Sequence, residues 1–213
     1  MATCFVVAGI ESVVFDVGGV LLDWNPRYLY RKLFSDDAAL ERFLMETDLH
    51  QWHIREHDHG RRPMTETIPE MCERFPEYAA EVAMWHDRFM ENVGGVINGT
   101  VEILDQLRGS VRLFALSNWP AETAADLKDT YRFFDWFDGI VISGEERVAK
   151  PDPEVFLRLC DRYALSPHTS LFVDDAETNT TAAEDLGFRS VLFSSPDQLC
   201  RELEALGLFA TTT

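Results

Sequence analysis

Polar side chains suited to binding a metal and a phosphate follow the apolar runs of this chain. They are Asp16 after "SVVF", Ser117 and Asn118 after "LFAL", Lys150 in the loop after "GIVI", and Asp174 and Asp175 after "SLFV". Carboxylates bind hard cations such as Mg²⁺, and a phosphoryl group between that cation and a lysine is stabilised electrostatically. Any one of these residues alone could be a helix cap or a turn residue. Together they predict chemistry on a phosphorylated ligand.

The apolar runs predict the strands that position these residues. β-branched runs recur at residues 12–17, 111–116, 139–142, 170–173 and 190–193. Continuous apolar runs are typical of parallel strands buried on both faces. Helical patterns lie between the later runs, and two begin with capping residues, Asp152 before Pro153 and Ser195 before Pro196. We therefore predict an α/β fold: a Rossmann-like three-layer core with a doubly wound parallel sheet, whose strand ends meet at one edge.

Residues 24–95 do not follow this alternation and predict a separate unit. Apolar residues recur there at helical spacing, and no strand is evident between them. We expect a small all-helical cap domain at 24–95, inserted after the first strand, and a core domain made of 1–23 and 96–213. The Gly- and Asn-rich stretch 92–100 predicts a hinge through which the chain returns to the sheet.

Charge and composition exclude several classes of partner. The formal net charge is -18, with 37 acidic and 19 basic residues, so the average field repels nucleic acid and anionic membranes. The first residues carry no basic segment and Glu11 interrupts their apolar run, so we expect no signal peptide and no membrane span. The cysteines, Cys4, Cys72, Cys160 and Cys200, have no paired spacing, which predicts free thiols and a cytoplasmic location.

Four stretches in this order resemble the motifs of a known superfamily. They are "FDVGGVL", "LSN", "AKPDP" and "FVDDAETN". They resemble the haloacid dehalogenase-like hydrolase superfamily, whose members are mostly Mg²⁺-dependent phosphatases, and the helical insertion is similar to that superfamily's small cap domain. The form of the first motif is similar to a branch that contains sugar-1-phosphate phosphatases and the N-terminal phosphatase domain of epoxide hydrolases.

The resemblance implies a nucleophile and a metal site. Asp16 would attack phosphorus and become an aspartyl-phosphate. Its other oxygen, the Gly18 carbonyl and Asp175 would bind Mg²⁺, with Asp174 beside them as a direct or indirect partner. Asn179 would either fix these acids or simply cap the next helix.

The resemblance also implies a phosphoryl cradle. Ser117 would bond a non-bridging phosphoryl oxygen, and Asn118 is a weaker candidate for the same task. Lys150 would orient Asp16 and offset the negative charge of the nucleophile and the phosphate.

Gly18 departs from the superfamily pattern. Phosphatases of this superfamily usually carry there a second aspartate that protonates the leaving oxygen, a function worth roughly a hundred- to ten-thousand-fold in rate. Three explanations fit: a substrate whose leaving group needs little protonation, an acid supplied by the cap, or loss of turnover. Gly18 could also serve only to let the backbone turn sharply.

The stretch "HQWHIREHDHGRR" at 50–62 offers candidate cap residues. As the cap acid it offers His53, Glu56, His57, Asp58 and His59. Glu56 and His57 are also candidate substrate-binding residues, and so is Trp52, which could cover an apolar substrate face or belong to the cap core. His53 and His57 are four apart, a spacing compatible with zinc. No third ligand accompanies them, so we predict a solvated or substrate-facing helix.

The function predicted from the sequence is an Mg²⁺-dependent phosphatase that hydrolyses a small phosphorylated metabolite, for example a sugar phosphate, through an aspartyl-phosphate. The alternative is a catalytically weak or inactive relative that binds a phosphorylated ligand or a partner. A dehalogenase fits less well, because dehalogenases of this superfamily lack the paired metal acids that "VDDAETN" supplies.

Overall fold

Five parallel strands form the central sheet, in the order β5-β4-β1-β6-β7. The computed structural model describes residues 9–209. The strands are β1 (Ser12–Phe15), β4 (Arg112–Ser117), β5 (Gly139–Ile142), β6 (Ser170–Asp174) and β7 (Arg189–Leu192). Each strand boundary lies within two residues of the run that predicts it. Phe15 is in register with Ala115 of β4 and Val173 of β6, so the ends of these three strands lie side by side.

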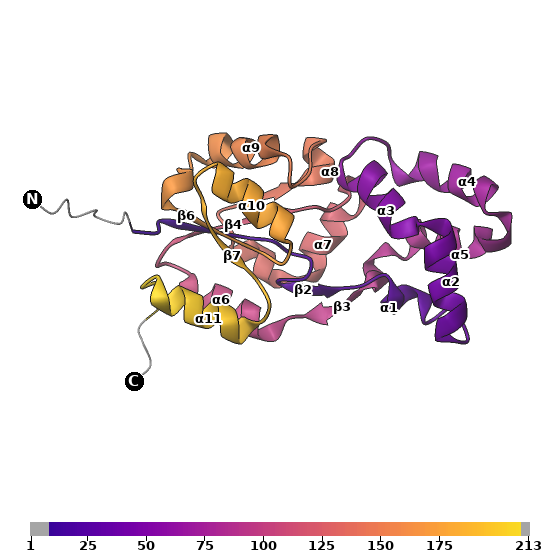
Figure 1. The fold of residues 1–213 in the computed structure, drawn as a ribbon, viewed down its shortest axis with the longest axis horizontal. Helices are drawn as coiled ribbons and strands as arrows, with labels where there is room; N and C mark the ends of the chain where they lie inside the picture. Colours follow the sequence, from indigo (N-terminus) through magenta and orange to yellow (C-terminus); the bar gives the residue numbers. More distant parts are fainter. Residues whose placement is uncertain (1–8, 210–213) are drawn as a thin grey trace, which may run out of the picture.

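Helices cover both faces of the sheet and make three layers, as Figure 1 shows. Alternate strand residues divide between two apolar clusters, with Phe15 on one face and Val14 on the other. The first face packs against α6 (Asn98–Leu107), α7 (Ala124–Thr130) and α11 (Pro196–Ala205). The second face packs against α9 (Pro153–Tyr163) and α10 (Glu177–Asp185). This confirms the predicted three-layer α/β core.

The predicted helix starts are also confirmed. The Asp152 side chain accepts a hydrogen bond from the Glu154 amide at the start of α9, and Ser195 accepts one from the Gln198 amide at the start of α11. Each cap is followed by a proline, whose missing N–H costs nothing in the first turn.

The segment after β1 forms the helical insertion, at the right of Figure 1. Its helices are α1 (Arg27–Tyr30), α2 (Asp37–Thr47), α3 (Leu49–His53), the π-helical turn η1 (Ile54–Asp58), α4 (Met64–Arg74) and α5 (Ala79–Asp87). A short α8 (Ser143–Glu146) follows β5, and 3-10 turns lie at Pro76–Tyr78, Phe89–Asn92, Ala121–Thr123, Arg132–Trp136 and Pro167–Thr169.

The two ends of the insertion form strands, which corrects the all-helical expectation. β2 (Leu22–Trp24) pairs antiparallel with β3 (Val93–Val96), and Leu22 lies opposite Val96. The expected hinge at 92–100 is therefore a paired strand followed by the start of α6. Gly94 fits because Tyr28 packs on it: an added Cβ would lie 2.6 Å from the Tyr28 ring.

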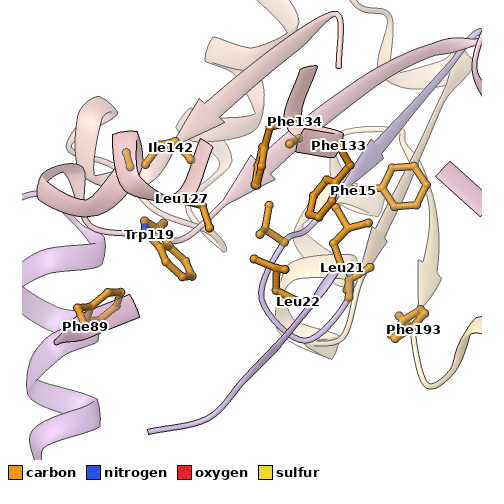
Figure 2. Close-up of a cluster of buried hydrophobic side chains, with 14 of the residues drawn as sticks. Phe15, Leu21, Leu22, Phe89, Trp119, Leu127, Phe133, Phe134, Ile142 and Phe193 are labelled. Atoms are coloured by element: carbon orange, nitrogen blue, oxygen red, sulfur yellow. The ribbon is translucent and has the colours of Figure 1, made fainter. Parts of the chain in front are cut away.

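A continuous apolar cluster links the core to the insertion. Figure 2 shows part of it: Phe15 and Leu21 come from the first strand and the loop after it, and Phe89 of the insertion lies beside Trp119 of the core. The Phe89 and Trp119 rings meet edge to face, with centroids 5.4 Å apart.

The described cysteines, Cys72, Cys160 and Cys200, are free thiols, and Cys4 lies outside the described residues. Between residues 9 and 209, no helix combines the length and apolar character that crossing a bilayer requires.

Candidate active site

Three carboxylates meet where β1 and β6 end. Asp16 directly follows β1, Asp174 is the last residue of β6, and Asp175 follows it. One ligand atom from each lies within 4.8 Å of the others. Among the residues that the structure describes, they are the one such group of acids, histidines and cysteines able to hold a metal ion. The parallel register places them there, because it brings the carboxyl ends of neighbouring strands together.

Lys150 neutralises part of this cluster. Its Nζ lies 2.8 Å from Asp16 Oδ1 and 2.7 Å from Asp174 Oδ2, and the residue is only 3% exposed. The Asn118 side chain makes two hydrogen bonds with the Lys150 main chain. Asn118 Nδ2 donates to the Lys150 carbonyl, and Asn118 Oδ1 accepts from the Lys150 amide, both at 2.9 Å. Asn118 therefore positions Lys150; this uses one of the two Nδ2 hydrogens, and the phosphoryl contact implied for Asn118, which lines the cavity described below, stays a prediction.

The electrostatics of the cluster favour a second cation. Burial raises the pKa of Asp16 well above its ordinary value; Lys150 opposes this shift and Asp174 adds to it. Burial also raises the pKa of Asp175, and Asp174 contributes. Burial lowers the pKa of Lys150, but the attraction of Asp16 and Asp174 outweighs this, so the net shift is upward and Lys150 stays charged. One lysine cannot balance three carboxylates, so an ionised Asp16 needs further positive charge.

The oxygen ligands fit Mg²⁺. Asp175 is exposed, and its carboxylate packs directly against Gly19, where an added Cβ would lie 2.2 Å from Asp175 Oδ2. Asp174 is fully buried and its oxygens are occupied by Lys150, by the Ala176 amide and by Asn179 Nδ2 at 3.0 and 3.1 Å. Asn179 therefore fixes an acid of the cluster, the first of the two roles considered for it. Asp16 and Asp175 are the freer ligands for a hard cation.

Ser117 ends β4 with a buried hydroxyl. Its Oγ has no hydrogen-bond partner among the described residues, although the residue is 1% exposed. A buried polar group without a partner is costly, and such groups are often completed by a ligand or an ion. Ser117 does not itself line the cavity described below, so the phosphoryl contact that the resemblance implies for its hydroxyl stays a prediction.

A cavity of about 310 Å³ lies over the cluster, between the core and the insertion. Its polar floor is formed by Asp16, Gly18, Asn118, Lys150, Asp175 and Asn179. Its other walls are mostly apolar or aromatic and are formed by Trp24, His50, His53, Ile54, Asp58, Phe89, Trp119, Pro120 and Ala176.

The structure places the predicted cap residues differently from the sequence expectation. Trp52, Glu56 and His57 do not line this cavity, whereas their neighbours His53 and Asp58 do. His53 and His57 are 2% and 1% exposed, so they are not solvated, whereas His50, His53 and Asp58 face the cavity as the substrate-facing alternative expects. Their Nδ1 atoms lie 2.9 Å apart in a buried hydrogen-bond network, an arrangement that leaves no room for zinc between them.

Trp24, Phe89 and Trp119 line the cavity and were not singled out from the sequence. One signal was available for Trp119, which directly follows Ser117 and Asn118 at a strand end. Phe89 gives no such signal, because only the folded insertion brings it to the core.

Comparison with known proteins decides the family. Residues 10–187 match haloacid dehalogenase-like hydrolases. The chain belongs to this family. A sesquiterpene phosphatase from Aspergillus oryzae is 24% identical over 199 residues, which cover 92% of this chain and 96% of that protein.

Solved structures of the same superfamily share the fold. A predicted HAD-like family hydrolase from Porphyromonas gingivalis superposes with a TM-score of 0.72 at 22% identity, covering 93% of this chain and 98% of that one. A HAD family enzyme from Bacteroides thetaiotaomicron, solved as a complex with magnesium and inorganic phosphate, has a TM-score of 0.66 at 21% identity, covering 88% of this chain and 96% of that one. The narrower resemblance to sugar-1-phosphate phosphatases and epoxide hydrolases stays a prediction.

Proposed function

We propose that this chain is an Mg²⁺-dependent phosphatase that acts on a small phosphorylated metabolite through an aspartyl-phosphate on Asp16. The observation that carries the proposal is the ion pair between Lys150 Nζ and Asp16 Oδ1, within a cluster of three carboxylates of which Asp16 and Asp175 line the cavity. Lys150 and the Val17 amide, which donates to the same oxygen at 2.6 Å, fix the direction of the carboxylate. A fixed nucleophile lowers the barrier because it is already oriented toward phosphorus.

The reaction proceeds in two displacements. An Asp16 oxygen attacks phosphorus while the bond from phosphorus to the leaving oxygen breaks. Water then attacks the aspartyl-phosphate, which releases inorganic phosphate and restores the Asp16 carboxylate. Ser117 Oγ donates to a non-bridging oxygen, and Lys150 offsets the charge of nucleophile and phosphoryl group. Bound Mg²⁺ would neutralise the carboxylates and polarise the phosphoryl group, with Asp16, Asp175 and the Gly18 carbonyl holding it.

The cavity walls support a preference among substrates. Trp24, Phe89 and Trp119 enclose the space in front of Asp16, and the polar side chains on these walls are His50, His53 and Asp58. Burying an apolar group there is favourable by roughly 25 cal/mol per Å² of apolar surface removed from water. An apolar phosphate ester therefore fits these walls better than a sugar phosphate, whose hydroxyls need polar partners. The sesquiterpene phosphatase among the relatives agrees with this preference.

The test is phosphate release from a panel of substrates with Mg²⁺. The panel holds farnesyl phosphate, sugar-1- and sugar-6-phosphates, an acyl phosphate and 4-nitrophenyl phosphate. We expect turnover that Asp16→Asn abolishes and that exhaustive chelation removes. Turnover in Asp16→Asn equal to that of the wild type would refute the mechanism, and faster turnover of sugar phosphates than of farnesyl phosphate would refute the substrate preference.

A further inference from the structure

The backbone at Gly18 does not explain why the usual acid is missing. A Cβ added to Gly18 would meet only the Trp24 Cβ, at 3.8 Å, which is an ordinary contact, and its φ is not positive. Gly19 is the residue that needs to be glycine, with a φ of 79° and the Asp175 carboxylate against it. The backbone at position 18 therefore accepts a Cβ, so its shape does not require glycine there.

Asp58 places a carboxylate on the opposite wall of the same cavity. The residue lines the cavity together with Asp16 and Gly18, and it is 7% exposed. It ends η1, which contacts α8 of the core (Figure 1).

The segment after Asp58 is held tightly to the core. A Cβ added to Gly60 would lie 2.3 Å from the Gly144 carbonyl oxygen. The Met64 amide donates to Glu122 Oε1 at 2.5 Å. The insertion therefore presents Asp58 to the cavity from a docked position.

His53 fixes the Asp58 side chain. The Trp85 indole Nε1 donates to His53 Nδ1 at 2.9 Å, and because an indole nitrogen can only donate, His53 Nδ1 is an acceptor. The ring proton of His53 is therefore on Nε2, which lies 3.2 Å from Asp58 Oδ1. His53 Nε2 thus faces one Asp58 oxygen at ion-pair distance, and the other Asp58 oxygen can carry or accept a proton.

The π-helical turn makes this pairing possible. In an α-helix residues three and four apart are neighbours, whereas a π-turn closes hydrogen bonds between residues five apart. η1 begins directly after His53 and ends at Asp58, five residues later. The local widening of the helix brings the two side chains to one face, and π-turns of this kind occur often at functional sites.

We propose that Asp58 is the general acid and base that replaces the missing carboxylate at position 18, and that His53 is its positioning residue. The inference rests on the proposed function and adds its proton donor. In the first displacement the bond from phosphorus to the leaving oxygen breaks, its electron pair stays on that oxygen, and protonated Asp58 gives its proton to it. In the second displacement the Asp58 carboxylate takes a proton from the attacking water and is ready again.

His50 is the competing donor on this wall. It also lines the cavity, and its ring lies 5.1 Å from that of Trp24. Burial lowers its pKa, and the neighbouring His53 contributes, so His50 holds a proton less readily than an exposed histidine. Among the residues that the structure describes, no ion pair orients the His50 ring, whereas Asp58 Oδ1 lies 3.2 Å from His53 Nε2.

The test compares leaving groups in Asp58→Asn. An alkyl phosphate needs its leaving oxygen protonated, whereas 4-nitrophenyl phosphate leaves as a stable anion. We expect kcat/KM of Asp58→Asn to fall roughly a hundred- to ten-thousand-fold with the alkyl phosphate and less than about tenfold with 4-nitrophenyl phosphate. Adding Gly18→Asp to Asp58→Asn should restore part of the alkyl phosphate turnover, because the new carboxylate can stand where the family's usual acid stands.

Two controls separate the possible failures. Asp48→Asn changes another acid of the insertion, one that is exposed and outside the cavity, and should leave the ratio of the two substrates unchanged. Asp16→Asn should lose turnover of both the alkyl phosphate and 4-nitrophenyl phosphate. If Asp58→Asn lowers kcat/KM equally for both substrates, or for neither, the assignment of Asp58 is overturned while the proposed phosphatase stands.

If His50→Asn selectively lowers kcat/KM for the alkyl phosphate and Asp58→Asn does not, the general acid is His50 and not Asp58. A wild type that releases phosphate from neither substrate would overturn the proposed function and this inference together.

Discussion

Two adjacent glycines in the first motif differ in what they do. Gly18 does not have a positive φ, and an added Cβ there would make an ordinary contact with Trp24, whereas Gly19 has a positive φ and the Asp175 carboxylate where a side chain would be. The sequence left open whether "GG" serves only a turn. Gly19 makes the turn with its positive φ, so the turn does not require a glycine at position 18.

Gly19→Ala is expected to weaken Mg²⁺ binding. The new Cβ would lie 2.2 Å from Asp175 Oδ2 and 2.7 Å from its Cγ, so the exposed carboxylate must rotate away from the cluster. The left-handed φ adds roughly 1–2 kcal/mol of backbone strain. Isothermal titration with Mg²⁺ should show a higher Kd than for the matched control Gly18→Ala. Equal affinities in the two variants would contradict the placement of Asp175.

At the scale of the element, the insertion shows where sequence patterns fail. The spacing of four residues correctly predicted that His53 and His57 are neighbours. It did not predict that His53 also lies beside Asp58, because that contact depends on the π-turn. No residue type marks a π-turn in a sequence. The pairing of β2 with β3 could not be predicted for another reason. Leu22 and Val96 lie far apart in the chain, and "VGGV" lacks the alternation of apolar and polar residues that is typical of a strand.

His57 of η1 contacts side chains of both α3 and α4, and from its buried position we predict that stability depends on pH. It contacts His53 Nδ1 at 2.9 Å and Thr67 Oγ1 of α4 at 2.7 Å. Burial, with a contribution from His53, lowers the pKa of His57 from 6.5 to about 3. Because the folded pKa lies below the unfolded one, the neutral ring stabilises the fold above about pH 6.5, and this contribution is lost as the pH falls toward 3.

The expected loss can be measured by urea unfolding between pH 7 and pH 4. The unfolding free energy of the wild type should fall by up to about 1.4 kcal/mol per pH unit more steeply than that of His57→Gln, which keeps a donor and an acceptor but does not titrate in this range. Parallel curves for the two proteins would contradict the neutral, buried state of His57.

At the scale of the whole molecule, the sequence predicts the core well because its signals are local. Each strand is a short apolar run that ends in a polar residue, and Asp152 and Ser195 cap their helices as expected. The order of parallel strands then brings Asp16, Asp174 and Lys150 together.

The cavity itself was less predictable, because both domains build it. Phe89 and Asp58 reach the site only when the insertion packs on the core, through contacts such as Phe89 with Trp119 in Figure 2. Such contacts depend on side-chain packing that no spacing in the sequence encodes. Residues that follow strands could therefore be named one by one, whereas in the insertion the sequence offered a group of candidates that contained His53 and Asp58 and omitted Phe89.

The central claim is that Asp16 becomes phosphorylated during turnover. The most direct measurement is to mix the protein with Mg²⁺ and an acyl phosphate, quench the reaction in acid within one turnover, and map the phosphoryl group by peptide mass spectrometry. The account predicts one added phosphoryl group on the peptide that contains Asp16, and none in Asp16→Asn. Phosphate release from the wild type with no phosphorylated Asp16 at any quench time, or a phosphoryl group on a different residue, would contradict it.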